Sequence, residues 1–232
     1  MPISITWLSH ASWLIEVGSV RLMLDPFLTD NPAAINKPSD YRDVNYVLLS
    51  HGHFDHLNDV ETIARANQAT IVTNFEIANW YAAKGFGEND LPAPLGMNLG
   101  GQTKLGEIGL KMVPAVHSSG LPDGSDGGTA SGFIVTAESK RIYFACDTAY
   151  FSDMRHYAHH VDLAVLPIGD LFTMGIDDCL VSIQQIEPKR VLPTHYNTWP
   201  PIAQDAAAWA DRVRAETTAE PIVLEVGGSV EV

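Results

Sequence analysis

The feature that most constrains this chain is a dense group of histidines placed directly after a strongly apolar run. The run Tyr46–Ser50 has the pattern of a buried strand, and the following residues include His51, His53, Asp55 and His56. A purely structural loop would need a separate partner for each of these polar groups, whereas metal ions satisfy them together. The spacing lets His51 and His53 face one metal while Asp55 and His56 face a second. The motif therefore predicts a metal site at the end of this strand.

Three further candidate ligands follow later strands. His117, Asp147 and His195 each stand just beyond a predicted strand. The ordered series HxHxDH, His, Asp, His resembles the metallo-β-lactamase superfamily at every position. The resemblance implies two metals per chain, with His51, His53 and His117 on the first, Asp55, His56 and His195 on the second, and Asp147 bridging them.

A narrower resemblance spans nearly the whole chain. It is carried by Trp7–Ile15 with His10, by Leu24-Asp25-Pro26, by Pro167–Asp170 with Phe172–Gly175, and by His195–Thr198. These stretches are similar to the YtkL-like (UlaG-like) metal-dependent hydrolases, a group related to a lactonase-like branch of the superfamily. The chain departs from these relatives at Phe144, Cys146 and Ser118, which puts the surroundings of the ligands in question. Cys146 is interpreted as a small buried residue.

The order of elements predicts an α/β fold in which two sheets are packed face to face with helices outside, an αββα sandwich. We expect one domain over residues 1–232. Within it, a series of strands followed by helices occurs twice, first up to about residue 100 and again after it. The expected strands cover residues 3–7, 12–17, 20–25, 46–50, 109–115, 131–137, 141–146, 162–167, 190–193 and 222–225. A first helix is expected to start at Asp59, with Asn58 as its N-cap. Further helices are expected over residues 76–84, 152–159, 177–186 and 203–216.

The composition of the chain limits the classes of partner that it is expected to bind. The formal net charge is −14, and no run of Lys or Arg could neutralise a phosphate polymer, so nucleic acid is not expected. No stretch reaches the roughly eighteen apolar residues of a membrane helix, and no export signal is seen. Two cysteines without CxxC spacing indicate reduced thiols in a cytoplasmic protein. The expected partner is a small-molecule substrate, and assembly into a homo-oligomer stays open.

The chemistry implied is hydrolysis by a hydroxide held between two divalent metals. Zn²⁺ is the expected metal, with Mn²⁺ and Fe²⁺ as alternatives. The substrate would be a small ester-like molecule, either a lactone or carboxylic ester, or a phosphodiester. Asp55 could also carry a proton, and His10 is predicted to bind substrate or act as a general acid, with a buried supporting role as the alternative.

Other polar residues receive more local interpretations. Asp25 is expected to support a ligand histidine or cap the following turn. The helical spacing of His156, His159 and His160 is interpreted as a solvent-facing row and not as a metal site. The residues predicted to line the substrate pocket are Asp170, Phe172, Thr173, Tyr196 and Asn197.

Two other classes of function remain open at this point. One is a di-iron redox protein of the same fold, although such proteins usually have a glutamate where His53 stands and work with a flavin partner. The other is a metal-binding protein without turnover. A true β-lactamase is disfavoured because such enzymes are commonly exported.

Overall fold

The computed structural model describes residues 3–232, whose strands form two seven-stranded sheets. The first sheet has the order β14-β1-β2-β3-β4-β5-β6 and the second the order β13-β12-β11-β10-β9-β8-β7. The strands of the first sheet are β1 (Ile3–Trp7), β2 (Trp13–Val17), β3 (Val20–Leu24), β4 (Tyr46–Leu48), β5 (Thr70–Asn74), β6 (Leu95–Met97) and β14 (Ser229–Glu231). The strands of the second sheet are β7 (Gln102–Leu105), β8 (Ile108–Pro114), β9 (Ser131–Ala137), β10 (Lys140–Phe144), β11 (Leu163–Pro167), β12 (Arg190–Thr194) and β13 (Glu220–Pro221).

Both sheets follow the same plan along the chain. Strands β1 to β3 form an antiparallel meander, and β3 to β6 then run parallel. In the second sheet β7 to β10 are antiparallel, and β10 to β13 run parallel. Consequently β1, β3 and β4 all end at one edge of the first sheet, and β8, β10, β11 and β12 all end at one edge of the second. The loops that leave these edges carry the predicted ligands.

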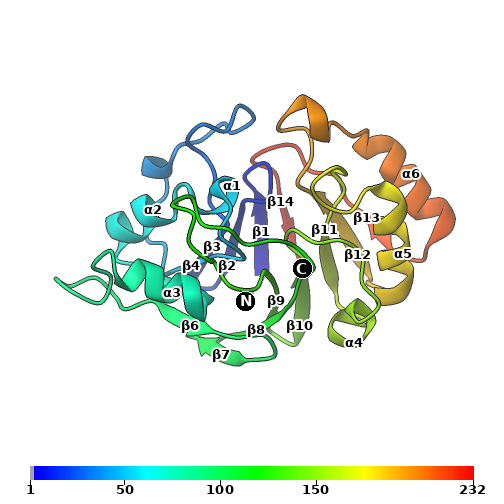
Figure 1. Cartoon of the computed structure of the whole chain (residues 1–232). Coiled ribbons are helices and arrows are strands. Elements are labelled where there is room, and N and C mark those ends of the chain that lie inside the picture. Colours follow the sequence, from blue (N-terminus) through cyan, green and yellow to red (C-terminus); the bar gives the residue numbers. More distant parts are fainter. Residues whose placement is uncertain (1–2) are drawn as a thin grey trace.

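Helices cover the outer face of each sheet (Figure 1). The helices are α1 (Phe54–Leu57), α2 (Val60–Asn67), α3 (Phe75–Ala82), α4 (Met154–Ala158), α5 (Ile176–Ile186) and α6 (Ala206–Glu216). Helices α2 and α3 lie outside the first sheet, and α5 and α6 lie outside the second. The predicted αββα sandwich is confirmed.

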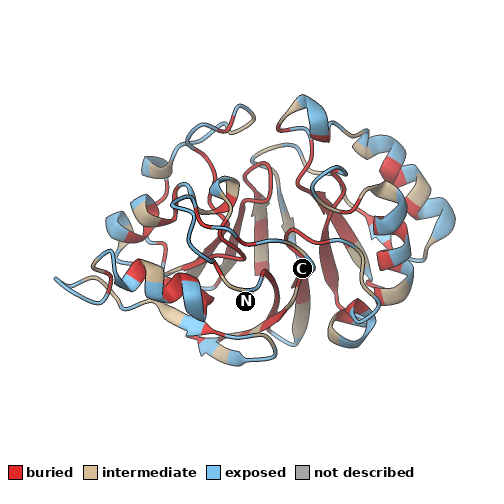
Figure 2. Cartoon of the chain, viewed as in Figure 1, coloured by how far each residue is buried: buried red, intermediate tan, exposed pale blue. Residues whose placement is uncertain are grey.

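Alternation along the strands divides the core into layers. In β3, Leu22 and Leu24 join the cluster between the sheets, whereas Met23 joins the cluster under α2 and α3. Successive strand residues point to opposite faces of a sheet, so an apolar run supplies both layers at once. The buried residues accordingly follow the strands and the inner faces of the helices (Figure 2).

Several predicted elements differ from those in the structure. The short strands β5, β6, β7 and β14 had no predicted counterpart, and the strand expected over 222–225 was wrong, since pairing occurs instead at β13. The first helix after β4 begins at Phe54, inside the stretch interpreted as a loop, and Asn58 ends it instead of capping the next. The N-cap of α2 is Asp59, whose carboxylate accepts hydrogen bonds from Leu28 and Thr29.

Among the described residues, none of the helices is long and apolar enough to cross a membrane.

Trp13 in β2 connects the two sheets. Its side chain is 1% exposed, its ring centroid lies 6.2 Å from that of Phe144 in β10, and its indole nitrogen donates to Thr194 Oγ1 at 3.1 Å. Phe144, one of the departures from relatives, therefore belongs to the packing between the sheets.

We predict that Trp13→Ala lowers the free energy of unfolding by about 3–5 kcal/mol, because it leaves a large cavity between the sheets. Trp13→Phe keeps most of the ring but loses the hydrogen bond and should cost less. Urea unfolding followed by circular dichroism measures both. A loss below about 1 kcal/mol for Trp13→Ala, within the range of surface substitutions, would contradict the role of this residue.

Candidate metal centre

The first group of candidate ligands lies at the ends of β4 and β8. His51 Nε2 is 3.0 Å from His53 Nδ1, and His117 Nε2 is 3.2 Å from the same atom. Three nitrogens that converge this closely offer lone pairs to a common point, as a tetrahedral metal site requires. These are the three residues predicted to share the first metal.

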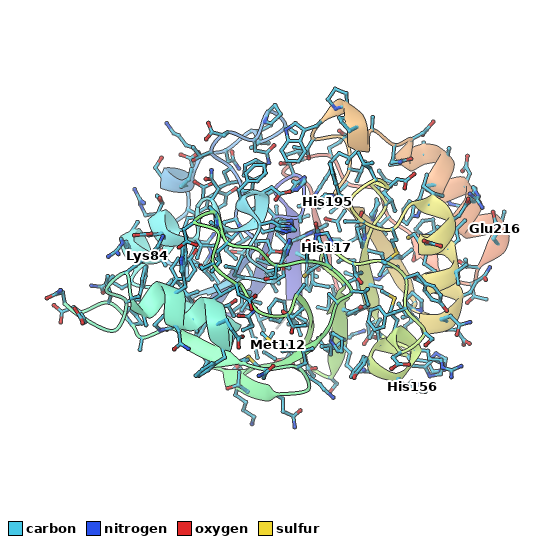
Figure 3. The ribbon with its side chains drawn as sticks, in the orientation of Figure 1. Lys84, Met112, His117, His156, His195 and Glu216 are labelled. Atoms are coloured by element: carbon cyan, nitrogen blue, oxygen red, sulfur yellow. The ribbon has the colours of Figure 1, made fainter. Side chains whose placement is uncertain are left out.

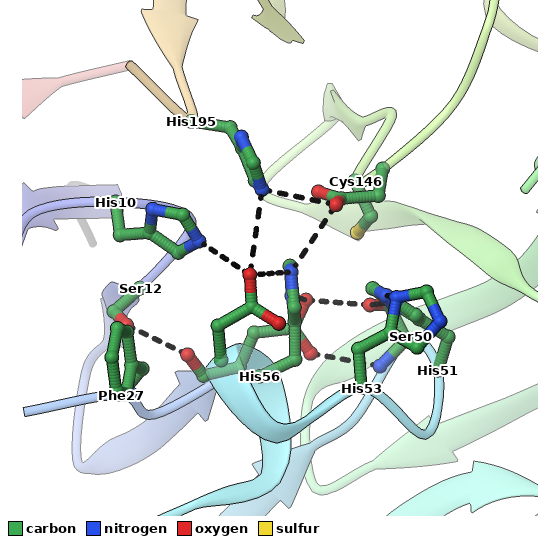
Figure 4. Close-up of polar contacts among 12 residues, drawn as sticks. His10, Ser12, Phe27, Ser50, His51, His53, His56, Cys146 and His195 are labelled. Atoms are coloured by element: carbon green, nitrogen blue, oxygen red, sulfur yellow. Dashed lines mark hydrogen bonds and ion pairs between the residues drawn. The ribbon is translucent and has the colours of Figure 1, made fainter. Parts of the chain in front are cut away.

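The second group of candidate ligands comes from α1, which holds Asp55 and His56, and from His195, which directly follows β12. Asp55 Oδ2 is 3.8 Å from His56 Nε2 and 3.8 Å from His195 Nε2. His10 Nε2 lies 3.1 Å from the same carboxylate oxygen, so four donor atoms gather here. Figure 4 shows His10, His56 and His195 converging on this point.

Asp147, just after β10, lies between the two groups. Its Oδ2 is 3.3 Å from His56 Nε2 and 3.0 Å from His195 Nε2, both of the second group, and 3.7 Å from His117 Nε2 of the first. The structure thus brings all seven predicted ligands together, with Asp147 between the two groups.

The donor atoms fit divalent metal ions. His56 Nε2, His195 Nε2 and Asp147 Oδ1 are buried and have no hydrogen-bond partner among the described residues. Buried polar atoms without partners are costly, and imidazole nitrogens with carboxylate oxygens suit zinc and similar ions. A metal would supply the missing partner for each atom.

Buried Asp25, directly after β3, orients ligands from both groups. Its carboxylate accepts from His56 Nδ1 at 2.8 Å, from the Ser50 backbone nitrogen at 2.8 Å and from Ser50 Oγ at 2.6 Å. Ser50 Oγ in turn accepts from His51 Nδ1 at 2.9 Å. Both histidines therefore keep a proton on Nδ1 and turn Nε2 towards the site, where it can bind a metal. The expectation that Asp25 supports a ligand histidine is confirmed, and Ser50 was missed.

Serines from the loop after β8 support the other ligands. Ser118 Oγ lies 3.2 Å from His53 Nε2 and leaves Nδ1 of that ring for the metal. Ser119 Oγ accepts from the Gly52 backbone at 3.1 Å, and a Cβ at Gly52 would come within 3.1 Å of the Ser119 carbonyl oxygen. The departure at Ser118 thus supplies a contact to a ligand.

The charges of the site also favour cations. Burial lowers the pKa of His51, which keeps it neutral. Burial opposes a charge on His195 and His56 as well, but the neighbouring carboxylates, Asp147 foremost among them, together outweigh burial. They raise the pKa of His195 to about 9 and raise the pKa of His56. Without a metal, protons on these two rings balance the carboxylates, so metal binding should release protons.

His10 is fully buried and does not line the cavity described below. Its Nδ1 lies 2.8 Å from Thr198 Oγ1, and its ring packs against Phe27 and Trp199. Burial lowers the pKa of His10 to about 3, so the neutral ring donates from Nε2 to Asp55. This geometry favours the supporting role of His10, and the predicted contact with substrate stays a prediction.

A cavity of about 750 Å³ opens above the ligands. Its lining includes His53, Asp55, His117, Asp147 and His195 together with Phe54, Leu171, Phe172 and Trp199. Of the five predicted substrate residues, only Phe172 lines it. Phe54, Leu171 and Trp199 were missed, although each stands within four residues of a predicted site residue.

The other four predicted substrate residues lie elsewhere. Tyr196 is buried and stacks on Trp7, with ring centroids 5.2 Å apart, and together with Asn197 it lines a different cavity. Neighbouring residues at the end of a strand point in opposite directions, so Tyr196 faces away from the side served by His195. Asp170 and Thr173 are held in the turn after β11, where the Asp170 carbonyl accepts from Thr173 at 3.1 Å.

Two further expectations concern residues outside the site. His156, His159 and His160 are exposed at α4, and Figure 3 places His156 far from His117 and His195. Cys146 is buried, and burial raises the pKa of its thiol, as expected for a packed residue. The exposure of the three histidines and the burial of Cys146 agree with these interpretations, although His159 and His160 bring their ring nitrogens close to the Glu187 carboxylate at the surface.

Comparisons with known proteins agree with this geometry. A family model described as the β-lactamase superfamily domain matches residues 20–196. A UPF0173 metal-dependent hydrolase of Pyrococcus furiosus is 41% identical over 236 residues, which cover 99% of each chain. The chain belongs to the UPF0173 metal-dependent hydrolases. The superfamily and the metal-dependent hydrolase predicted from the motifs are therefore confirmed.

Other relatives of this hydrolase extend the comparison. A UPF0173 metal-dependent hydrolase of Thermus thermophilus is 43% identical over 213 residues, covering 91% of this chain and 92% of the relative. A solved metallo hydrolase from Ignicoccus hospitalis superposes with a TM-score of 0.90 at 30% identity, over 100% of this chain and 99% of that one. The likeness covers the sandwich and all the ligand-bearing loops.

We predict that Asp25→Asn lowers metal affinity by about 10- to 100-fold, because it removes the acceptor that orients His56 and, through Ser50, His51. Ser50→Ala should weaken binding less, since His56 keeps its carboxylate. Titration of metal-free protein with Zn²⁺, followed by calorimetry, measures the affinities. Equal affinity for the wild type and both variants, with circular dichroism unchanged, would rule out this orienting role.

We predict that His10→Ala leaves the metal content unchanged but lowers kcat/KM, because Asp55 loses the group that holds its Oδ2. The measurement is metal content by elemental analysis together with turnover on the same samples. His10→Gln, which can still donate to Asp55, should recover part of the loss. Full turnover by His10→Ala would contradict the positioning role.

Proposed function

We propose that this hydrolase cleaves a small ester-like substrate with two divalent metal ions, zinc being the expected metal. The observation that carries the proposal is the position of Asp147, whose carboxylate lies within 3.7 Å of a histidine from each ligand group. A shared carboxylate between two complete donor sets supports two metals at one centre better than one. The all-imidazole first group and the mixed second group are donor sets that zinc accepts, as do manganese and iron.

Two metals bound in this way would lower the pKa of water to about 7 and polarise the bond to be cut. The chain supplies the groups around that chemistry. His51, His53 and His117 hold one side of the centre, while Asp55, His56 and His195 hold the other. No serine or cysteine nucleophile lies among the residues that line the cavity except Ser118, whose hydroxyl is engaged with His53. Hydrolysis by activated water is therefore the reaction that the lining supports.

Asp55 is the residue placed to move a proton. Its Oδ2 faces His10, His56 and His195, and the contact of 3.1 Å with His10 Nε2 holds that oxygen in place. Its side chain is 14% exposed, and it lines the cavity. A carboxylate that borders the cavity with one oxygen held in place is the group we propose to pass a proton to the leaving group.

We also propose that the protein works in the cytoplasm on a small molecule. Cys146 and Cys179 are both free and buried, which suits a reducing compartment. The cavity has the size of a small-molecule site.

The experiment that tests the proposal measures metal content and activity on the same samples. Protein purified without chelator should hold close to two metal equivalents, lose activity after dialysis against a chelator, and regain it when Zn²⁺ is restored. A panel of esters, lactones and phosphodiesters identifies the reaction. Two bound irons with reductase activity and no hydrolysis would instead indicate a redox protein.

The matched variants are His53→Ala and His156→Ala. His53 belongs to the first ligand group, whereas His156 is an exposed histidine on α4. His53→Ala should lose about one metal equivalent and at least 100-fold in kcat, in line with removal of a group needed in the transition state. His156→Ala should match the wild type. Full activity of His53→Ala would overturn the two-metal mechanism.

A further inference from the structure

The walls of the cavity above the metal centre are apolar, and this feature bears on the choice of substrate. Phe54, Leu171 and Phe172 line the cavity and are 57%, 65% and 55% exposed. Single exposed apolar side chains are common on folded proteins, but a contiguous group of them usually marks a binding surface. Three of them around one opening, directly above the ligands, indicate a surface kept for an apolar group.

The aromatic wall is supported from beneath. Phe54, the first residue of α1, lies 6.2 Å from Trp199 between ring centroids, and buried Phe27 contacts both rings at 5.9 and 5.8 Å. Because Phe27 is fully buried, it fixes the two rings above it. This wall is therefore formed before any ligand arrives.

The opposite wall is held by a hydrogen-bonded turn. Asp170 Oδ1 accepts from the Leu171 backbone at 2.8 Å, and the Asp170 backbone donates to Met174 at 3.2 Å. Asp170 and Leu171 have φ values of 60° and 46°, which L residues rarely adopt. The turn thus presents Leu171 and Phe172 at the cavity instead of burying them in the core.

Charge is missing from these walls. Among the described residues, the cavity is lined by no lysine and no arginine, and its ionisable groups are the candidate ligands. The chain carries a net charge of −14, so a negative group outside the reach of the metals would meet no compensating cation. The walls therefore suit a neutral group.

We propose that the substrate is a neutral carboxylic ester or lactone whose non-reacting part is an apolar chain or ring held between Phe54 with Trp199 on one side and Leu171 with Phe172 on the other. This inference rests on the proposed hydrolytic function. The walls exclude a second charged group, such as a terminal phosphate or carboxylate, from the substrate. Phe172 and Leu171 are thus specificity-determining residues.

The test compares esters with the same leaving group. For 4-nitrophenyl esters of acetate, butyrate and hexanoate, kcat/KM should rise by about three- to fourfold per methylene until the cavity is filled. The mono-4-nitrophenyl ester of adipate has the chain length of hexanoate but ends in a carboxylate, and it should react at least tenfold more slowly. Binding of hexanamide and of adipamic acid to metal-free protein, followed by ligand-detected NMR, should show the same preference without turnover.

Matched variants assign the preference to the wall. Phe172→Ala and Leu171→Ala should flatten the dependence on chain length, with the loss in kcat/KM largest for hexanoate and smallest for acetate. Phe75→Ala is the control, since Phe75 in α3 is 56% exposed and does not line the cavity. It should keep the full dependence.

The outcomes separate this inference from the proposed function. Hydrolysis with no dependence on chain length, or with adipate equal to hexanoate, would overturn the apolar substrate and leave the hydrolase standing. Selective binding of hexanamide by metal-free protein without hydrolysis of any ester or lactone would support the apolar site and overturn ester hydrolysis. Absence of both would overturn both.

Discussion

The interaction on which the site depends is the burial of the Asp25 and Asp147 carboxylates close to the partly exposed carboxylate of Asp55. Asp25 and Asp147 are 0% and 3% exposed, and an isolated buried carboxylate is strongly unfavourable. Hydrogen bonds satisfy Asp25, but Asp147 Oδ1 has no partner among the residues that the structure describes. The chain thus folds around a negative charge that its own residues balance only by protonating histidines. Divalent cations remove that imbalance, which ties the stability of the site to metal binding.

The carboxylates and histidines of the site lie close together because the loops that carry them leave neighbouring edges of the two sheets. The carbonyl oxygen of His10, in the loop after β1, accepts from the Trp7 indole at 3.0 Å, Thr194 Oγ1 at 2.8 Å and the His195 backbone at 3.0 Å. This carbonyl joins a loop of the first sheet to the end of β12 in the second. His10, Asp25, Cys146 and His195 all have φ between 45° and 55°. Such strain collects where function requires a fixed geometry, and the surrounding packing compensates for it.

The sequence predicted well which polar residues the structure brings together, because each lies beside a strong local signal, the end of an apolar strand. It also predicted the sandwich, since alternating strands and helices leave few other arrangements. It could not predict contacts between residues that are far apart in the chain. Ser50 Oγ hydrogen-bonds to both Asp25 and His51, and the ring of Trp199 packs near that of Phe54. Tyr196 was misassigned because proximity in sequence to His195 does not determine which side of the strand end a residue faces.

The apolar walls and the metal centre contribute differently to substrate recognition. Metals attract any oxygen-rich group, so they discriminate poorly among esters, phosphates and carboxylates. Walls without cations lower the local dielectric and exclude water, which strengthens the electrostatic effect of the ligands on the reacting bond. A second negative charge on a substrate would find no cation in these walls. The free-energy cost of that unpaired charge favours binding of neutral over charged substrates. A chain with a net charge of −14 can therefore select a neutral molecule even though its reactive centre is built for anions.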